Sequence, residues 1–197
     1  MWRASVLAAW VLLAPPLAAQ WSAGAEIGLL GFTGGGADTS VAGAGNVLRP
    51  STGRTYALRV QRQGSTFGFG VSVLYSHTGV GAENDEMVVE AKGTMTLYEV
   101  APEVFVVVAR PGAGGALRLH AGALLDRWSL QGYEDRDRGG ALAAASLDWP
   151  VAGPWTATFR AGVALGSSVF MQDELPDGFA TRATWRRSIA AGLQLRL

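Results

Sequence analysis

The sequence predicts an all-β protein, an eight-stranded antiparallel up-and-down β-barrel that spans a membrane. Three observations support this fold class. Apolar and polar residues alternate with a period of two in eight segments. Long and short connections alternate between these segments, and their polar faces carry acids and arginines in equal number.

The composition limits the kind of protein. The chain has 197 residues, enough for one domain. Its 16 Lys and Arg balance 16 Asp and Glu, which argues against a nucleic-acid-binding protein because such a protein carries a basic surplus. The absence of cysteine excludes disulfides, thiolate metal sites and a Cys nucleophile. Charged residues make up only 16% of the chain, below the roughly 25% of soluble domains.

Residues 1–19 have the composition of a secretory signal peptide. Arg3 is followed by a mostly apolar stretch and by small residues that end at Ala19. The apolar stretch is shorter than the roughly 20 residues that a membrane-spanning helix needs. We therefore expect cleavage after Ala19 and a mature barrel domain over 20–197. A retained N-terminal anchor is the alternative.

Eight segments of the mature chain have the pattern of strands. The alternation is clearest in the third segment, where Val71 and Tyr75 share one face and Ser72 lies on the other. The expected strands are 21–32, 54–63, 66–78, 94–109, 116–129, 140–149, 155–168 and 182–197.

The connections indicate how the strands are joined. Long connections at 33–53, 79–93, 130–139 and 169–181 alternate with tight turns between the other neighbours. A closed meander with long loops at one rim and short turns at the other produces this order, whereas a Greek-key sandwich does not require it. Gly34-Gly35-Gly36 lacks the Lys-Ser/Thr of a phosphate loop and is interpreted as flexible loop.

The polar faces distinguish a membrane barrel from a soluble one. Balanced charges among Gly, Ser and Thr suit an enclosed lumen in which ions pair with one another. A surface in water would hold more lysine than the single Lys92. The apolar faces would then contact lipid. A soluble lipocalin-like binding barrel is the alternative. The expected lumen residues are Glu26, Glu99, Glu103, Asp126, Asp148, Arg59, Arg118, Arg160, Arg186, Arg196 and His120.

Aromatic residues fall near both expected rims, as in the two interfacial rings of a membrane barrel. The short-turn rim is expected to hold Trp21, Phe67, Trp149 and Trp155. The long-loop rim is expected to hold Phe32, Tyr56, Tyr75, Trp128 and Trp185.

With these features, the chain resembles the small eight-stranded bacterial outer-membrane barrels of the OmpA/OmpX type over essentially all of 20–197. Residues 192–197, a Gly followed by alternating bulky apolar positions, are similar to the terminal signal read by the outer-membrane barrel assembly machinery. That signal usually ends in an aromatic residue, and here it ends in Leu197. The resemblance implies a bacterial outer-membrane location and contact with outer-membrane lipids and lipopolysaccharide. It also implies a monomer with no nucleic-acid partner.

A catalytic site has weak support. Some barrels of this size trim or acylate lipid A with Ser and His near the outer rim. A nucleophile of this kind needs a base within hydrogen-bonding reach and an acid that orients the base. The third and seventh expected strands, 66–78 and 155–168, should lie on opposite sides of the barrel. Ser167 and Ser168, at the end of the seventh strand, should therefore not reach His77 at the end of the third. His120 is expected to join the lumen network through Glu99 or Glu103. The candidates at the long-loop rim are Ser76, His77, Ser167, Ser168, Glu83 and Asp173.

The remaining features favour a protein without an active site. The acidic loop residues lack the spacing of a calcium-binding loop, and eight strands leave an interior only wide enough for side chains, which disfavours a pore. We expect no catalytic, cofactor-binding or metal site. The expected function is that of a non-enzymatic surface barrel with long loops for structural, adhesive or partner-binding roles. A lipid A-modifying deacylase or acyltransferase is the alternative. The acidic loop residues are Glu83, Asp85, Glu86, Asp173, Glu174 and Asp177.

Overall fold

The computed structural model describes residues 20–39, 46–83, 88–112 and 114–197. The expected signal peptide, 1–19, lies outside the described residues. None of the helices in the described ranges is long and apolar enough to cross a membrane. The elements are β1 (Gln20–Thr33), β2 (Gly36–Asp38), β3 (Val47–Pro50), β4 (Gly53–Gln63), β5 (Phe67–Glu83), β6 (Val88–Ala109), β7 (Ala116–Leu130), β8 (Arg136–Ala152), β9 (Trp155–Gly166), the 3₁₀ turn η1 (Gln172–Glu174), β10 (Phe179–Thr181) and β11 (Thr184–Arg196).

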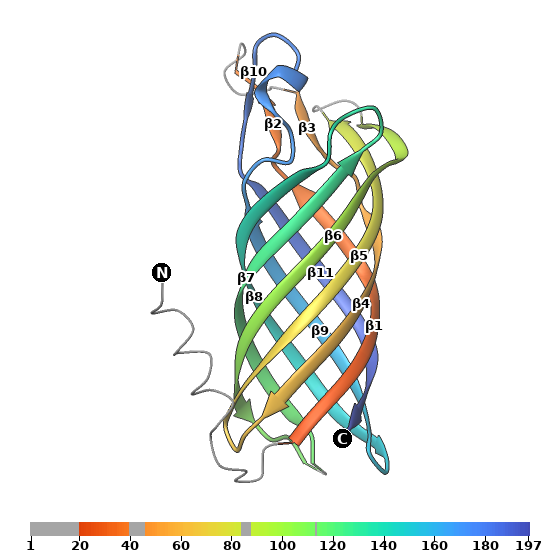
Figure 1. Ribbon diagram of the computed structural model, residues 1–197, viewed down its shortest axis with the longest axis vertical. Coiled ribbons are helices and arrows are strands. Elements are labelled where there is room, and N and C mark those ends of the chain that lie inside the picture. Colours follow the sequence, from red (N-terminus) through yellow and green to blue (C-terminus); the bar gives the residue numbers. More distant parts are fainter. Residues whose placement is uncertain (1–19, 40–45, 84–87, 113) are drawn as a thin grey trace, which may run out of the picture.

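Eight long antiparallel strands form a closed ring (Figure 1). Its order is β1, β4, β5, β6, β7, β8, β9 and β11, and β11 closes the ring by pairing with β1. Each ring strand therefore pairs with its neighbours along the chain. The eight predicted strands and the up-and-down barrel are confirmed.

The strands are tilted relative to the barrel axis. Because of this tilt, a row of paired residues followed once around the ring returns to its starting strand at a different residue, and this displacement is the stagger of the barrel. The path from Trp21 through successive paired residues passes Val104 and Val163 and returns to β1 at Gly31, ten residues further along. At a rise of about 3.3 Å per residue and a tilt of about 40°, this stagger corresponds to about 25 Å along the barrel axis. The apolar band of a small outer-membrane barrel has about this height.

Side chains of the ring strands alternate between the outside and the inside of the barrel. Large apolar side chains are exposed on the outer wall, among them Ile27, Leu29, Leu58, Val71, Val73, Val104, Phe159 and Ile189. Polar and charged side chains are buried inside, among them Glu26, Arg59, Ser72, Glu99, Glu103, Arg118, His120 and Asp148. This polarity is the reverse of that in a soluble barrel, so the structure favours the membrane barrel over the lipocalin-like alternative.

The outward aromatic residues form two rings, as predicted, with one correction. Trp21, Phe67, Trp149 and Trp155 are exposed at the short-turn rim, and Tyr56, Tyr75, Tyr98 and Trp185 are exposed toward the other rim. Phe32 and Trp128, predicted for the second ring, are instead buried inside the barrel. They share the inward parity of Glu26 and Asp126 on their own strands, so the ladder turns them toward the lumen.

The long-loop end contains more strand than the sequence predicts. β5 and β6 continue past the predicted limits of 78 and 94. The predicted loop 33–53 contains the short strands β2 and β3, and the predicted loop 169–181 contains β10. We call the assembly of β10, β2, β3 and the outer parts of β5 (79–83) and β6 (88–94) the upper sheet; it stands above the barrel (Figure 1). β8 begins at Arg136, inside the predicted loop 130–139, and β9 ends at Gly166 rather than at 168.

We expect Val71→Arg to destabilise the barrel by about 2–4 kcal/mol, because it places a charge on the lipid-facing wall near the middle of the apolar band. Val71→Leu is the matched control and should leave the free energy of unfolding within about 0.5 kcal/mol of the unsubstituted protein. The measurement is urea unfolding in lipid vesicles. Equal stabilities for the two variants would show that the outer wall does not face hydrocarbon.

Candidate functional site

The middle of the lumen is organised around the Glu103 carboxylate of β6. Its Oε1 lies 2.6 Å from Nη1 of Arg59, and its Oε2 lies 2.6 Å from Nη2 of Arg160. Nδ1 of His120 lies 3.2 Å from Oε2, and the Ser72 hydroxyl donates a hydrogen bond to Oε1 at 3.1 Å. These partners come from β4, β5, β7 and β9, so one carboxylate joins opposite walls of the barrel.

Arg59 extends this network to β1. Its Nε lies 3.1 Å from Oε1 of Glu26, so the guanidinium is shared between two carboxylates. Nε2 of His120 and the hydroxyl of Ser146 lie 2.9 Å apart. The network confirms that His120 belongs to the lumen and that its acidic partner is Glu103.

Ion pairs also fill the lumen on both sides of this network. Toward the short turns, Arg118 pairs with Asp148, which accepts a hydrogen bond from Thr158 at 2.9 Å. Toward the long loops, Arg186 pairs with Glu99 and lies 3.7 Å from Asp126.

Ten of the eleven predicted lumen residues therefore face inward. The exception is Arg196, which is exposed at the end of β11. It has lumen parity, but β11 ends there and the ring no longer encloses it.

The free space within these charged layers is small. A cavity of about 60 Å³ is lined by Arg59, Glu103 and Arg160, and another of about 20 Å³ is lined by Asp126 and Thr184. Since one water molecule needs roughly 10–15 Å³ measured in this way, the cavities have room for a few waters. Arg186 and Ala164 line both cavities.

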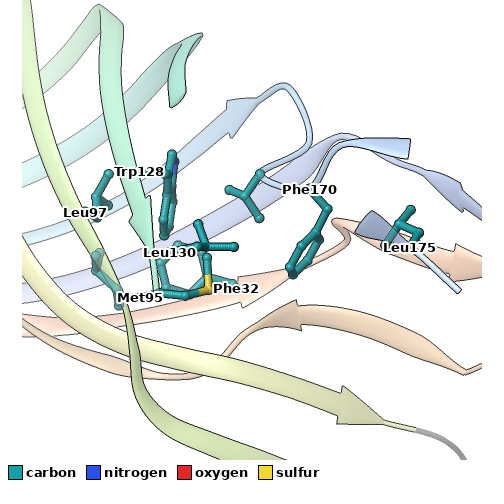
Figure 2. Packing of buried hydrophobic residues seen from close by; sticks show 9 residues of the cluster. Phe32, Met95, Leu97, Trp128, Leu130, Phe170 and Leu175 are labelled. Atoms are coloured by element: carbon teal, nitrogen blue, oxygen red, sulfur yellow. The ribbon is translucent and has the colours of Figure 1, made fainter. Parts of the chain in front are cut away.

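An apolar plug closes the lumen at the long-loop end (Figure 2). Trp128 and Phe32 pack edge to face with ring centroids 5.7 Å apart. Residues 167–178, which we call the capping segment, place Val169, Phe170 and Leu175 against them. The sequence predicts polar residues throughout the lumen, and the plug shows that this is wrong for its upper part. The buried plug residues are Leu30, Phe32, Met95, Leu97, Trp128, Leu130, Val169, Phe170 and Leu175.

A buried ion pair holds the capping segment in place. Nη2 of Arg136 donates to Oε1 of Glu174 at 2.6 Å, and Nη1 donates to the Val169 carbonyl at 3.0 Å. The Arg136 side chain is only 2% exposed. The backbone N–H of Met171 donates to Oε2 of Glu174 at 2.8 Å. Glu174, one of the acidic loop residues, therefore makes a structural contact.

The glycines of the first long connection also serve the plug. Gly35 has a φ of +121°, and a Cβ there would lie 3.0 Å from the Phe170 ring. Its carbonyl accepts hydrogen bonds from the Ser168 hydroxyl and the Arg182 backbone N–H, both at 2.8 Å. The prediction that Gly34-Gly35-Gly36 is only flexible loop is therefore wrong, because Gly35 permits a close contact that a side chain would block.

The candidate catalytic residues do not form a site. Ser76 and His77 lie within β5 rather than at its end and face opposite sides of the wall, with Ser76 buried and His77 exposed. The Ser76 hydroxyl donates to the Arg54 carbonyl at 2.8 Å, and Glu83 pairs with Arg49 at 2.7 Å.

Ser167, Ser168 and Asp173 belong to the capping segment, and the Ser168 hydroxyl is bonded to Gly35. No group of three His, Cys, Asp or Glu residues able to hold a metal ion occurs in the described part of the chain.

One edge of the upper sheet has no neighbouring strand in the described part of the chain. The ladder between β6 and β7 begins at Met95, so among the described residues β6 from Val88 to Gly93 pairs only with β5. The opposite edge of the upper sheet, β10, is covered by the Gln172 side chain. Its Nε2 donates to the Phe179 carbonyl at 2.6 Å, and its Oε1 accepts from the Thr181 N–H at 3.2 Å. We call residues 88–93 the free edge of β6.

Solved structures of outer-membrane proteins are similar to this fold. No protein-family model matches the chain, and no curated protein matches it. Neisserial surface protein A (NspA) is similar in structure, with a TM-score of 0.58 and 12% sequence identity over 90% of this chain and 97% of that one. The outer membrane protein OprG from Pseudomonas aeruginosa has a TM-score of 0.59 and 8% identity, over 91% and 96% of the two chains.

These similarities show the fold, which is that of the small outer-membrane β-barrels. They confirm the resemblance and the fold class drawn from the sequence. Together with the apolar outer wall, they support the outer-membrane location.

We expect Glu103→Gln to lower the free energy of unfolding by about 3–5 kcal/mol, because it leaves Arg160 buried without its acidic partner. The control is Arg127→Gln, which breaks the exposed Arg127–Asp137 pair and should cost less than about 1 kcal/mol. Urea unfolding in vesicles measures both. A loss at Glu103 no larger than that of the control would refute the central role of this carboxylate.

We also expect acid to loosen the capping segment. Burial alone would raise the pKa of Glu174, but hydrogen bonds from Arg136 and from the Met171 N–H hold this pKa below its usual 4.5. A carboxyl whose pKa is lowered by folding stabilises the folded form above its unfolded pKa, and this contribution is lost as pH falls through the folded value.

The measurement is the hydrogen-exchange protection of residues 168–175, which should decrease between pH 7 and about pH 3. In Glu174→Gln, protection should be low at both pH values, whereas Asp173→Asn should behave like the unsubstituted protein. An unchanged acid response in Glu174→Gln would assign the effect to another group.

Proposed function

We propose that this chain is a non-enzymatic outer-membrane barrel that binds an extended segment of a partner protein at the free edge of β6. Membrane insertion through the assembly machinery, removal of residues 1–19 and a monomeric state are part of the same proposal. The barrel wall faces lipid, and paired ions and the plug fill the lumen. The upper sheet is therefore the surface available for binding a partner protein.

The free edge of β6 is the observation that carries this proposal. Residues 88–93 have no strand partner on one side within the ranges that the structure describes, and such an edge is a template for adding another strand. Glu90 and Lys92 present opposite charges there, and Val89 is 56% exposed. Backbone bonds would supply affinity, and these side chains would supply selectivity.

Few apolar residues of the loops are accessible to a partner. Phe170 is buried in the plug and Phe179 packs against it from β10. Among the apolar residues of the long loops, Tyr133 and Met171 are exposed. The free edge of β6 is therefore a larger binding surface than these two side chains. The enzyme alternative receives no support, because Ser76 and His77 face opposite sides of β5 and the Ser168 hydroxyl is bonded to the Gly35 carbonyl.

The test removes residues 88–90 of the free edge, together with the β5 residues 81–83 that pair with β3, and leaves the ladders of the ring intact. Val80 and Ala91 are cross-strand partners, so residues 81–90 can be replaced by an Asn-Gly turn that joins them. Both proteins, folded in vesicles, are offered a displayed library of random peptides. We expect the unsubstituted protein to select peptides that bind at least about tenfold more weakly to the shortened variant. Tyr133→Ser is the control and should retain binding.

A second arm identifies the mode of binding. Selected peptides methylated on alternate backbone nitrogens lose the donors needed for strand pairing, and we expect them to bind poorly. Equal binding of methylated and unmethylated peptides, or equal binding to the shortened variant, would contradict the proposal. Heat-modifiable migration on gels shows in each case that the barrel has folded.

A further inference from the structure

The outer wall is hollowed over β7, β8 and β9. A groove of about 600 Å³ is lined by Leu119, Ala143, Ala145, Ala161 and Val163, together with Arg187 of β11. It lies on the lipid-facing side and is almost entirely apolar apart from the guanidinium.

The hollow follows from the side chains of β8. The groove touches β8 at Ala143 and Ala145, and above it the outward positions 139 and 141 are also small, Gly and Ala, whereas neighbouring strands present Leu119, Leu125 and Phe159. Six residue steps extend about 20 Å along the strand, which a tilt of about 40° reduces to about 15 Å of depth. One leaflet of a hydrocarbon core of about 30 Å has the same depth.

Arg187 places a charge at the upper end of this groove. In the staggered row that starts at Trp21 and ends at Gly31, Arg187 is the last residue before Gly31, so it lies near the top of the apolar band. Its side chain is exposed on the outer wall. No hydrogen bond or ion pair joins it to another residue in the described ranges. A cation at that depth requires an anion supplied from the interface.

We propose that this groove binds lipid A of the outer leaflet, with one acyl chain along β8 and a phosphate on Arg187. This inference rests on the membrane placement in the proposed function, but not on partner binding at β6. The phosphate makes charge-assisted hydrogen bonds to the guanidinium, and the chain fills the space left by the alanines. A second copy is a poorer occupant, because a two-fold axis along the membrane normal through the groove would bring two Arg187 side chains together.

The experiment counts lipids retained by the folded protein in detergent by native mass spectrometry. The probes are lipid A, lipid A without its phosphates, and phosphatidylcholine. We expect one lipid A to be retained, with about tenfold weaker retention of the dephosphorylated form. Arg187→Gln should cause a similar loss, and Ala143→Leu should weaken both forms of lipid A by filling the groove.

Matched controls separate this site from the rest of the wall. Arg54→Gln removes another exposed arginine on the outer face of β4, and Ala191→Leu enlarges an exposed alanine of β11; both should retain lipid A normally. If the controls lose as much lipid as Arg187→Gln and Ala143→Leu, or if phosphatidylcholine is retained equally well, the proposal is wrong. The peptide-binding assay is unaffected by these variants, so its failure is distinguishable from failure of the groove.

Discussion

The pairing of buried charges across the lumen is the interaction on which this structure depends. Glu103 connects Arg59, His120 and Arg160, which come from three other strands of the ring. A barrel with eight strands has no room to hydrate these ions fully, so each must find its partner on another wall. The charged side chains of the lumen therefore stabilise the fold. Specific recognition is left to the upper sheet and, on the outer wall, to places where small residues expose the backbone.

The ring strands could be predicted from the sequence because lipid and lumen impose opposite demands on alternate residues. That pattern ends where both faces of a strand meet water, which is why the outer parts of β5 and β6 look like loop in the sequence. The inward positions of Phe32 and Trp128 follow from the alternation along their strands. Each is an even number of residues from an inward acid on its own strand, and this parity outweighs the usual preference of aromatic side chains for the interface.

The candidate sites were less predictable, since they depend on register. The sequence indicates which charged residues face the lumen, but the ten-residue stagger decides that Glu103 meets Arg160. The free edge of β6 exists because β7 ends at Leu130 while β6 starts at Val88. Neither feature has a local signature. The role of Arg136 was hidden for the same reason, because its partner Glu174 lies 38 residues away in a segment without regular pattern.

The plug also has a consequence for the order of assembly. Leu30 and Phe32 come from the first strand, whereas Val169 and Phe170 belong to the connection that leads to the last strand, which begins at Thr184. Their contacts span nearly the whole sequence, as does the seam between β1 and β11, and such distant contacts are slow to form. The same event that closes the seam brings the two halves of the plug together. An unclosed ring is thus also an uncapped one, with its apolar plug residues accessible to chaperones and proteases until the final strand is in place.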